Sequence, residues 1–317
     1  MNMLFEQAPD LEDIRARLDS ADAAVRRMAV MRIGETAEPE AVGLLVQALG
    51  DRDSEVRAEA ARVLDEFDAL EGLEGLLAAL SDADEGVRTA AAQTLAENKS
   101  SDAAPALLRE LGNPDPFVKA AVLRAIKPLR VEAALGPAMD AVANADGRVR
   151  REAVGVLAYL KAETVLPALL DVARNDTEAE VRRAAVGALV FADGDLVRPA
   201  LVQALGDEDW QVREEAARVL GKLRAEGSVP ALMEAMDDEY WQVRQKAACS
   251  LGQLGDARAV AVLGSALSHG ISNLRKEAVG ALGEIGDQSA RPFLQQALGD
   301  EDPDVRKLAA WAMGRLQ

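Results

Sequence analysis

The sequence predicts an all-α protein, a solenoid made of ten stacked helical hairpins. Apolar residues make up 49% of the 317 residues and aromatic residues only 3%, a composition typical of closely packed helices. A short motif, Val or Leu followed by Arg or Lys, recurs every 31 residues, with one interval of 32. Such self-similarity indicates a repeat array. The motif begins at Val25, Val56, Val87, Val118, Val149, Val181, Val212, Val243, Leu274 and Val305.

The motif lies near the start of the second helix of each hairpin. Apolar residues recur four and eight positions after the Val or Leu, as Ala29 and Ile33 show in the first repeat, so they form one stripe of a helix. An Asp three positions before the Val is suited to cap the first turn. These capping residues are Asp22, Asp53, Asp84, Asp115, Asp146, Asp209 and Asp302.

The first helix of each hairpin is predicted about a dozen residues upstream, in segments such as AVGLLVQAL and LPALLDVA. We expect prolines in its first turn, where a missing N–H costs little. They are Pro105, Pro137, Pro167, Pro199, Pro230 and Pro292. Residues 1–8 are expected to form a short lead-in, and residues 9–317 a single continuous solenoid of ten repeats.

The repeat unit resembles the HEAT repeat in its bilin-lyase (PBS lyase) HEAT-like form. The segments GDEDWQVREEAARVLGKL and GDEDPDVRKLAAWAMGRL carry the resemblance, which extends over all ten repeats. It implies a right-handed α-solenoid whose second helices line a concave groove. It also implies a ladder between neighbouring repeats, in which the Arg after the Val pairs with an Asp five positions before the next Val.

Most aromatic residues fall on the side of the second helices that faces away from the apolar stripe. Exposed rings are enriched at binding surfaces, so we expect them to anchor a partner, although some could simply pack between neighbouring helices. The candidate anchors on that side are Trp210, Trp241, Trp311, Phe117 and Tyr159, and Phe191 lies on the same side. Tyr240, also a candidate anchor, lies one position outside it.

Charge on that side differs along the chain. Repeats 1–3 carry two basic and six acidic residues there, whereas repeats 4–8 carry seven basic and four acidic ones. A cationic, aromatic groove favours a partner protein or peptide with acidic and apolar groups, although ordinary variation on a solvated face gives a similar count. The candidate cations are Arg148, Arg151, Arg183, Arg218, Lys222 and Lys246.

Composition excludes several function classes. The formal net charge of −18 argues against binding to nucleic acid or to an anionic membrane surface. The single cysteine, Cys249, and the lack of a secretory signal or membrane span indicate a cytoplasmic protein. The single histidine, His269, leaves no two-histidine metal site and little scope for a catalytic relay. We therefore expect no metal, no cofactor and no enzyme activity.

The leading interpretation is a non-enzymatic scaffold or adaptor that binds a partner segment in its concave groove. The alternative is a bilin-lyase-like protein or cofactor-insertion chaperone that handles a tetrapyrrole. If the protein is an enzyme, this alternative makes it a lyase of the bilin-attachment type. A nucleic-acid enzyme is a third alternative, which the net charge opposes. Trp311 and the apolar residues around it suggest self-association through the C-terminal end.

Overall fold

The structure of the protein is a computed structural model that describes residues 11–36, 38–67 and 70–316. The lead-in predicted for residues 1–8 lies outside the described residues. The chain divides into two compact units, residues 1–160 and 161–317, and each is considered separately below. The single continuous solenoid therefore stays a prediction.

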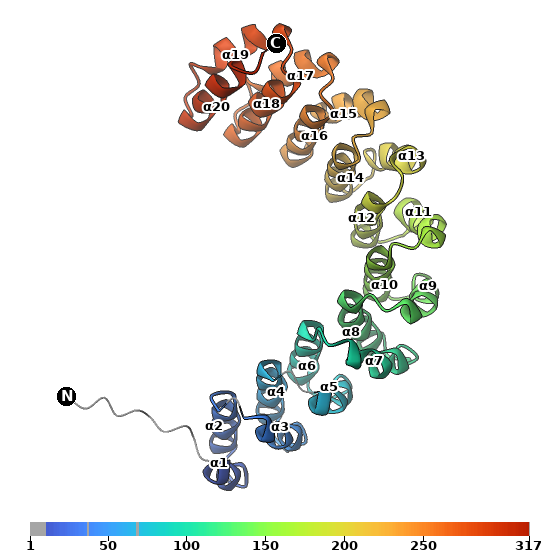
Figure 1. The fold of residues 1–317 in the computed structure, drawn as a ribbon, viewed down its shortest axis with the longest axis vertical. Helices are drawn as coiled ribbons and strands as arrows, with labels where there is room; N and C mark the ends of the chain where they lie inside the picture. The colour runs from blue at the N-terminus through green and yellow to red at the C-terminus, as the bar shows by residue number, and fades with distance from the viewer. Residues whose placement is uncertain (1–10, 37, 68–69, 317) are drawn as a thin grey trace, which may run out of the picture. The chain divides into compact units, whose positions relative to one another are not determined.

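Twenty α-helices form ten hairpins in the described part of the chain, which confirms the predicted all-α repeat fold (Figure 1). The first unit contains α1 (Leu11–Leu18), α2 (Ala23–Gly34), α3 (Val42–Ala48), α4 (Ser54–Val63), α5 (Leu73–Ala79), α6 (Glu85–Glu97), α7 (Ala104–Glu110), α8 (Pro116–Ile126), α9 (Leu135–Ala141) and α10 (Gly147–Leu160). The second contains α11 (Leu166–Asn175), α12 (Ala179–Ala188), α13 (Gly194–Ala204), α14 (Trp210–Lys222), α15 (Val229–Glu234), α16 (Trp241–Leu254), α17 (Val260–Ala266), α18 (Ser272–Ile285), α19 (Arg291–Ala297) and α20 (Pro303–Met313).

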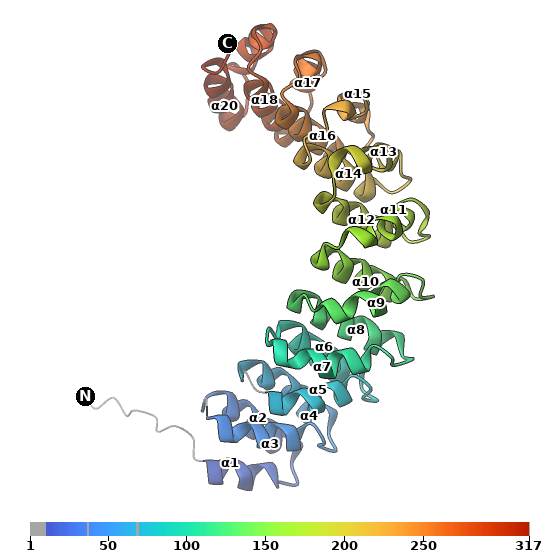
Figure 2. The same ribbon diagram turned by 45° about the vertical axis from the view of Figure 1, so that its right-hand side comes forward.

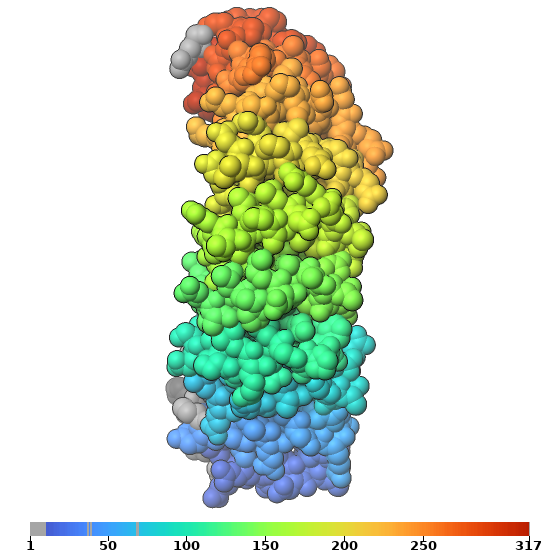
Figure 3. Space-filling model, turned by 90° about the vertical axis from the view of Figure 1, so that its right-hand side faces the viewer, coloured from blue at the N-terminus to red at the C-terminus, as the bar shows by residue number. Residues whose placement is uncertain are grey.

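In each unit the hairpins stack so that even-numbered helices form one layer and odd-numbered helices the other (Figures 1 and 2). Each even helix of the second unit packs against the next even helix, from α12 to α20. Within residues 161–317 these even helices lie on the inner side of the curve (Figure 1). Figure 3 views each unit from the side of the odd helices, where successive hairpins appear as stacked bands.

The repeated apolar residues form the core of both units. Val56, Val212 and Val243 are fully buried, as are Ala60 and Leu220, because the stripe of each even helix faces its own hairpin and its neighbours. Six of the seven predicted capping aspartates are helix N-caps. Asp53, for example, accepts a 2.9 Å hydrogen bond from the backbone N–H of Glu55. The seventh, Asp146, accepts the backbone N–H of Arg148.

One predicted proline position was wrong. Five prolines lie in the first turn of a helix as expected, but Pro199 lies inside α13. The five are Pro105, Pro137, Pro167, Pro230 and Pro292. The reason is an earlier cap, because Asp193 accepts the backbone N–H of Asp195 and starts α13 at Gly194. In other repeats a short 3₁₀ turn occupies that place, and the α-helix begins only beside the proline.

A ladder of ion pairs joins neighbouring repeats, as the resemblance implies. In each of five rungs, Nε and Nη2 of an arginine donate to the two carboxylate oxygens of an aspartate in the next repeat, at 2.6–3.0 Å. This two-pronged geometry is the strongest form of ion pair in proteins. The rungs are Arg26–Asp51, Arg57–Asp82, Arg182–Asp207, Arg213–Asp238 and Arg275–Asp300.

Candidate functional site

The candidate aromatic anchors divide between the two ends of the even helices. Trp210 and Trp241 are the first residues of α14 and α16, and Phe117 is the second residue of α8. Tyr159, in contrast, is the last residue but one of α10. A helix of 14 residues is about 21 Å long, so rings at its two ends serve different places on the surface. The helical pattern alone does not separate them.

Trp210 and Tyr240 form one packed unit. Their rings stack with centroids 5.5 Å apart and an interplanar angle of 11°, and the guanidinium carbon of Arg213 lies 5.6 Å from the centroid of the Tyr240 ring. Arg213 also holds Asp238 in the ladder, so the stack is attached to a rung. Trp210 therefore contributes to packing between α14 and α16, and Tyr240 keeps 39% of its surface exposed.

Two other rings are held by cations from the preceding repeat. The guanidinium carbon of Arg130 lies 5.7 Å from the Tyr159 ring, and Nζ of Lys161 lies 4.3 Å from the Phe191 ring. Both cations follow the end of an even helix and have a left-handed backbone, with φ of 52° and 53°. The contacts are typical cation–π pairs, and they link neighbouring repeats within each unit.

Phe117 and Trp311 also have partners. The guanidinium carbon of Arg88 lies 5.8 Å from the Phe117 ring, and that of Arg315 lies 5.1 Å from the Trp311 ring. Trp311 also packs closely on α18, since a Cβ added at Gly283 would lie 2.6 Å from its Cζ3. Trp311 nevertheless remains 45% exposed, and self-association through this end stays a prediction.

Trp241 differs from the other rings. It has no stacking or cation–π partner among the residues that the structure describes, and its side chain is half-buried at the start of α16. A large ring with one accessible part and no partner is the kind of residue that dominates binding at protein interfaces.

Three of the six candidate cations are neutralised by carboxylates. Arg148 binds Asp146 through two nitrogens, and its hydrogen bonds lower the pKa of Asp146 to about 2. Arg151 pairs with Glu152 at 3.2 Å, and Arg218 pairs with Glu215 one turn earlier on α14. These three side chains thus contribute less positive field than their sequence count suggests.

The other three cations, Arg183, Lys222 and Lys246, form no ion pair with any residue that the structure describes. Sequence differences between repeats explain the case of Arg183. Its counterpart in the first repeat, Arg27, pairs with Glu55 and Glu59. Gln211 stands at the place of Glu55, and Glu215, at the place of Glu59, pairs with Arg218 instead. The three cations lie on α12, α14 and α16, which pack side by side. We call these cations together with Trp241 the even face.

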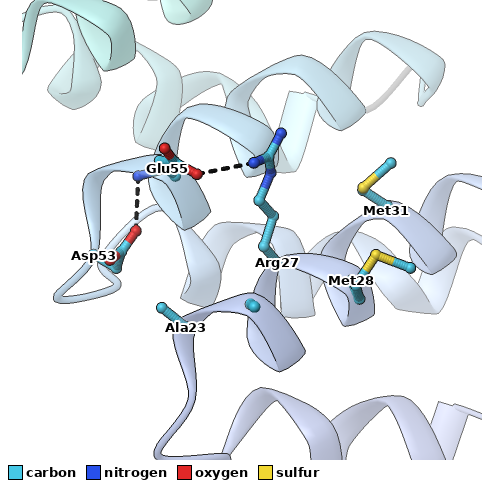
Figure 4. A pocket seen from close by; sticks show the side chains of 7 residues that line it. Ala23, Arg27, Met28, Met31, Asp53 and Glu55 are labelled. Carbon is cyan, nitrogen blue, oxygen red and sulfur yellow. Dashed lines mark hydrogen bonds and ion pairs between the residues drawn. The ribbon is translucent and has the colours of Figure 1, made fainter.

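The pattern analysis missed one hollow on α2. Met28 and Met31 are 55% and 43% exposed, and they line a pocket of about 400 Å³ beside Arg27 (Figure 4). Arg27 donates to Glu55 at 2.9 Å across the pocket rim. Exposed methionines occur at adaptable binding surfaces, and their spacing of three residues was the available signal.

Cys249 and His269 have no arrangement typical of catalysis. Burial, together with Glu277, raises the pKa of the Cys249 thiol to about 11, so the thiolate nucleophile is disfavoured. The ring of His269 accepts the backbone N–H of Ile271 through Nδ1 in the turn before α18. Within residues 11–36, 38–67 and 70–316, no group of three or more His, Cys, Asp or Glu side chains is suited to a metal ion.

No helix in the described part of the chain is both long and apolar enough to cross a membrane. Comparison of the sequence with curated proteins gave no match.

Several solved structures share the fold. An engineered protein is 23% identical and matches with a TM-score of 0.51 over 97% of this chain and 99% of its own. A structure of importin beta is 19% identical, with a TM-score of 0.64 over 97% of this chain and 50% of its own. Kap95p bound to RanGDP is 16% identical, with a TM-score of 0.65 over 96% and 49%. The chain spans about half the length of these two proteins. At such identities the likeness shows the fold alone.

The sequence also matches a family model directly. The model, described as HEAT repeats, matches residues 11–96, 73–148, 137–201, 198–271 and 261–317. These overlapping matches cover every hairpin of the structure from α1 to α20. The chain therefore belongs to the HEAT repeat family.

Proposed function

We propose that the protein is a non-enzymatic interaction scaffold whose even face binds an acidic and apolar segment of a partner protein. The observation that carries the proposal is the set of three cations, Arg183, Lys222 and Lys246, which no carboxylate of the described residues neutralises. These cations lie on three adjacent helices of a chain whose net charge is −18.

Charge and shape complement each other in this proposal. The cations would attract the Asp or Glu side chains of a partner, and this attraction would orient the partner and speed its association. An apolar side chain of the same segment would pack on Trp241, which supplies affinity because a buried ring excludes much water. The stacked pair Trp210–Tyr240 would form a rigid wall beside Trp241, at the start of α14 and α16.

Two further observations support binding rather than catalysis. The high pKa of Cys249 and the position of His269 in a turn leave the even face without an activated nucleophile or base. Solved structures with this fold include Kap95p in complexes with RanGDP and with Nup1, which are proteins. We infer by analogy that a protein segment is the ligand here as well.

A display library of random peptides, selected on the full-length chain, tests the proposal. We expect enrichment of peptides that combine Asp or Glu with an aromatic or aliphatic residue. Trp241→Ala should weaken the enriched peptides at least about tenfold, because hot-spot losses exceed roughly 1.4 kcal/mol. The matched control is Leu196→Ala, which removes a 65% exposed apolar side chain from α13 and should leave binding unchanged.

Other outcomes would redirect or overturn the proposal. Enrichment of basic peptides, or equal losses for Trp241→Ala and Leu196→Ala, would contradict binding at the even face. A visible absorption band that appears when the protein is incubated with bilin, and that Trp241→Ala removes, would favour the tetrapyrrole alternative and the bilin-lyase HEAT-like subfamily.

A further inference from the structure

Three rungs of the ladder lack a carboxylate, because Asn113, Asn144 and His269 stand opposite Arg88, Lys119 and Arg244. Arg88 donates to the backbone carbonyls of Asp82 and Ala83. Arg244 on α16 stands where Arg213 and Arg275 stand in the neighbouring repeats, but the residue opposite it is His269 instead of Asp238 or Asp300. No hydrogen bond or ion pair of the Arg244 side chain occurs within the described residues, and its Nε is buried without a partner. A buried donor left in this way is rare in folded proteins.

His269 replaces only half of what an aspartate does in this position. In an intact rung the Asp carboxylate accepts the backbone N–H two residues later, as Asp300 does from Asp302 at 2.8 Å, and it also binds the arginine. His269 keeps the first bond, since Nδ1 accepts the N–H of Ile271 at 3.1 Å. Burial and the charges of Arg244 and Arg275 lower the pKa of His269, so its ring is neutral at pH 7 and supplies no anion for Arg244.

An open pocket adjoins this rung. Its volume is about 250 Å³, and its polar lining consists of Arg244, His269, Ser265, Ser268 and Asp237. Among the described residues, Ser268 makes no side-chain hydrogen bond, whereas Ser265 donates to the carbonyl of Ala261. Arg244 and the Ser268 hydroxyl therefore offer donors, and the exposed carboxylate of Asp237 also lines the pocket.

Equivalent pockets occur in two other repeats and allow a comparison within the same chain. In the first of these pockets the arginine is Arg26, and its guanidinium already binds the carboxylate of Asp51. In the second, Lys119 faces Asn144, but the residue at the position of Ser265 is Asp140, whose carboxylate disfavours a second anion. Of these three pockets, the Arg244 pocket has an arginine that forms no ion pair with any described residue and has Ser265 in place of Asp140. The exposed carboxylate of Asp237 also lines it, so a bound anion has to contact Arg244 on the side away from Asp237.

We propose that the Arg244 pocket is a binding site for a carboxylate group, which completes the broken rung in place of the missing aspartate. The two oxygens of the ligand accept from the guanidinium of Arg244 as the oxygens of Asp238 and Asp300 do from Arg213 and Arg275. The carboxylate belongs either to a free small acid or to an Asp or Glu side chain of a polypeptide. This site lies at the turn before α18 and is independent of the function proposed for the even face.

The test is a titration of full-length, ¹⁵N-labelled protein, with the arginine Nε–H resonance of Arg244 as the readout at constant ionic strength. Acetate and a peptide with blocked ends and one Asp are the two probes, and the same peptide with Asn in place of Asp is the control. We expect a saturable shift with both probes and none with the Asn peptide. Binding of the Asp peptide at least tenfold tighter than acetate would identify a polypeptide source, and equal binding a free acid.

Variants separate the site from general charge effects. His269→Asp restores the intact rung and should abolish the shift while raising the melting temperature. Asp51→His is the mirror experiment, and it should make the Arg26 pocket responsive to the same probes if far-ultraviolet circular dichroism shows that the variant is folded. No saturable shift in the wild type, an equal shift in His269→Asp, or a response to sulfate but not to acetate would overturn the proposal.

Discussion

The ring of Trp210, the first residue of α14, stacks on the ring of Tyr240, the residue before α16, with centroids 5.5 Å apart. The stack bridges two neighbouring repeats at the same edge as the Arg213–Asp238 rung. Trp210 occupies the same repeat position as Trp241, yet its ring packs between two repeats, whereas Trp241 has no stacking or cation–π partner among the described residues.

Removal of the stack should cost stability. We expect Tyr240→Ala to lower the free energy of unfolding by about 1–2 kcal/mol, since it removes an aromatic pair and a cation–π contact. Tyr240→Phe keeps both contacts and should change the stability by less than about 0.5 kcal/mol. Urea denaturation followed by tryptophan fluorescence measures both. Equal losses for Ala and Phe would show that the hydroxyl, not the stack, matters.

Loss of an intact rung should be much more severe than loss of a surface ion pair. The Arg182 and Asp207 side chains are 7% and 11% exposed, so Asp207→Ala leaves a largely buried guanidinium without its main partner and should cost about 3 kcal/mol. Asp195→Ala breaks an exposed pair with Arg198 and should cost less than about 1 kcal/mol. Hydrogen exchange of the α12 and α14 amides measures the local effect. Similar exchange in the two variants would contradict the structural role of the ladder.

The ladder should also make stability depend on acid. Hydrogen bonds from Arg26, Arg57 and Arg275 lower the pKa values of Asp51, Asp82 and Asp300 below the ordinary range of an aspartate. A carboxyl group with a lowered folded-state pKa stabilises the fold above its unfolded pKa, and this contribution disappears as pH falls through the folded pKa. We therefore expect unfolding stability to decrease as pH falls below about 4.

Asp300→Asn tests this dependence, because it removes one of the titrating groups. The variant should be less stable at pH 7 but should lose less further stability between pH 5 and acid than the wild type. Thermal melts across that pH range measure both effects. Parallel curves for the two proteins would show that the rung does not titrate with folding.

The thiol of Cys249 should react slowly. Its pKa of about 11 leaves about one thiolate in a thousand at pH 8, whereas an ordinary cysteine with a pKa near 8.5 has roughly a quarter. Reaction with a disulfide reagent in the folded protein should thus be about 100-fold slower than in urea. Equal rates would place the thiol in a solvated environment.

Left-handed residues after the even helices should respond differently to glycine. Arg224 has φ of 49° and no ring partner in the described part of the chain, so Arg224→Gly should stabilise the protein by about 1 kcal/mol. Arg130 has a similar φ but contacts Tyr159, and Arg130→Gly should gain less because the cation–π contact is lost. Thermal melts of the two variants compare these effects. A larger gain for Arg130→Gly would mean that the Tyr159 contact contributes nothing.

The helices and the ladder were predictable because both depend on residues within one period of the repeat. Asp53 caps α4 through a residue two positions later, and Arg57 meets Asp82 at a spacing that every intact rung shares. The prediction for Pro199 was wrong because Asp193 caps α13 and starts this helix at Gly194, five residues before the proline.

The candidate site was less predictable, because the roles of its residues depend on contacts between repeats. The Tyr159 ring contacts Arg130, which lies 29 positions earlier in the sequence. Arg130 has a left-handed backbone conformation that the repeat pattern does not predict. Arg183 has no ion pair with the described residues because Gln211 replaces one of the two glutamates that pair with Arg27, and the equivalent of the other, Glu215, pairs with Arg218. A count of charges or rings on one helix face contains neither relationship.

Salt-dependent affinity shows whether the cations of the even face bind an acidic partner segment. An acidic, apolar peptide from the display selection would be titrated into the wild type, into Arg183→Ala/Lys222→Ala/Lys246→Ala, and into Arg198→Ala/Arg258→Ala/Arg291→Ala, which removes the same charge from the odd side. We predict that only the first triple variant weakens binding at least about tenfold and flattens the salt dependence. Equal weakening by both triple variants would mean that net charge alone attracts the peptide and would contradict binding at the even face.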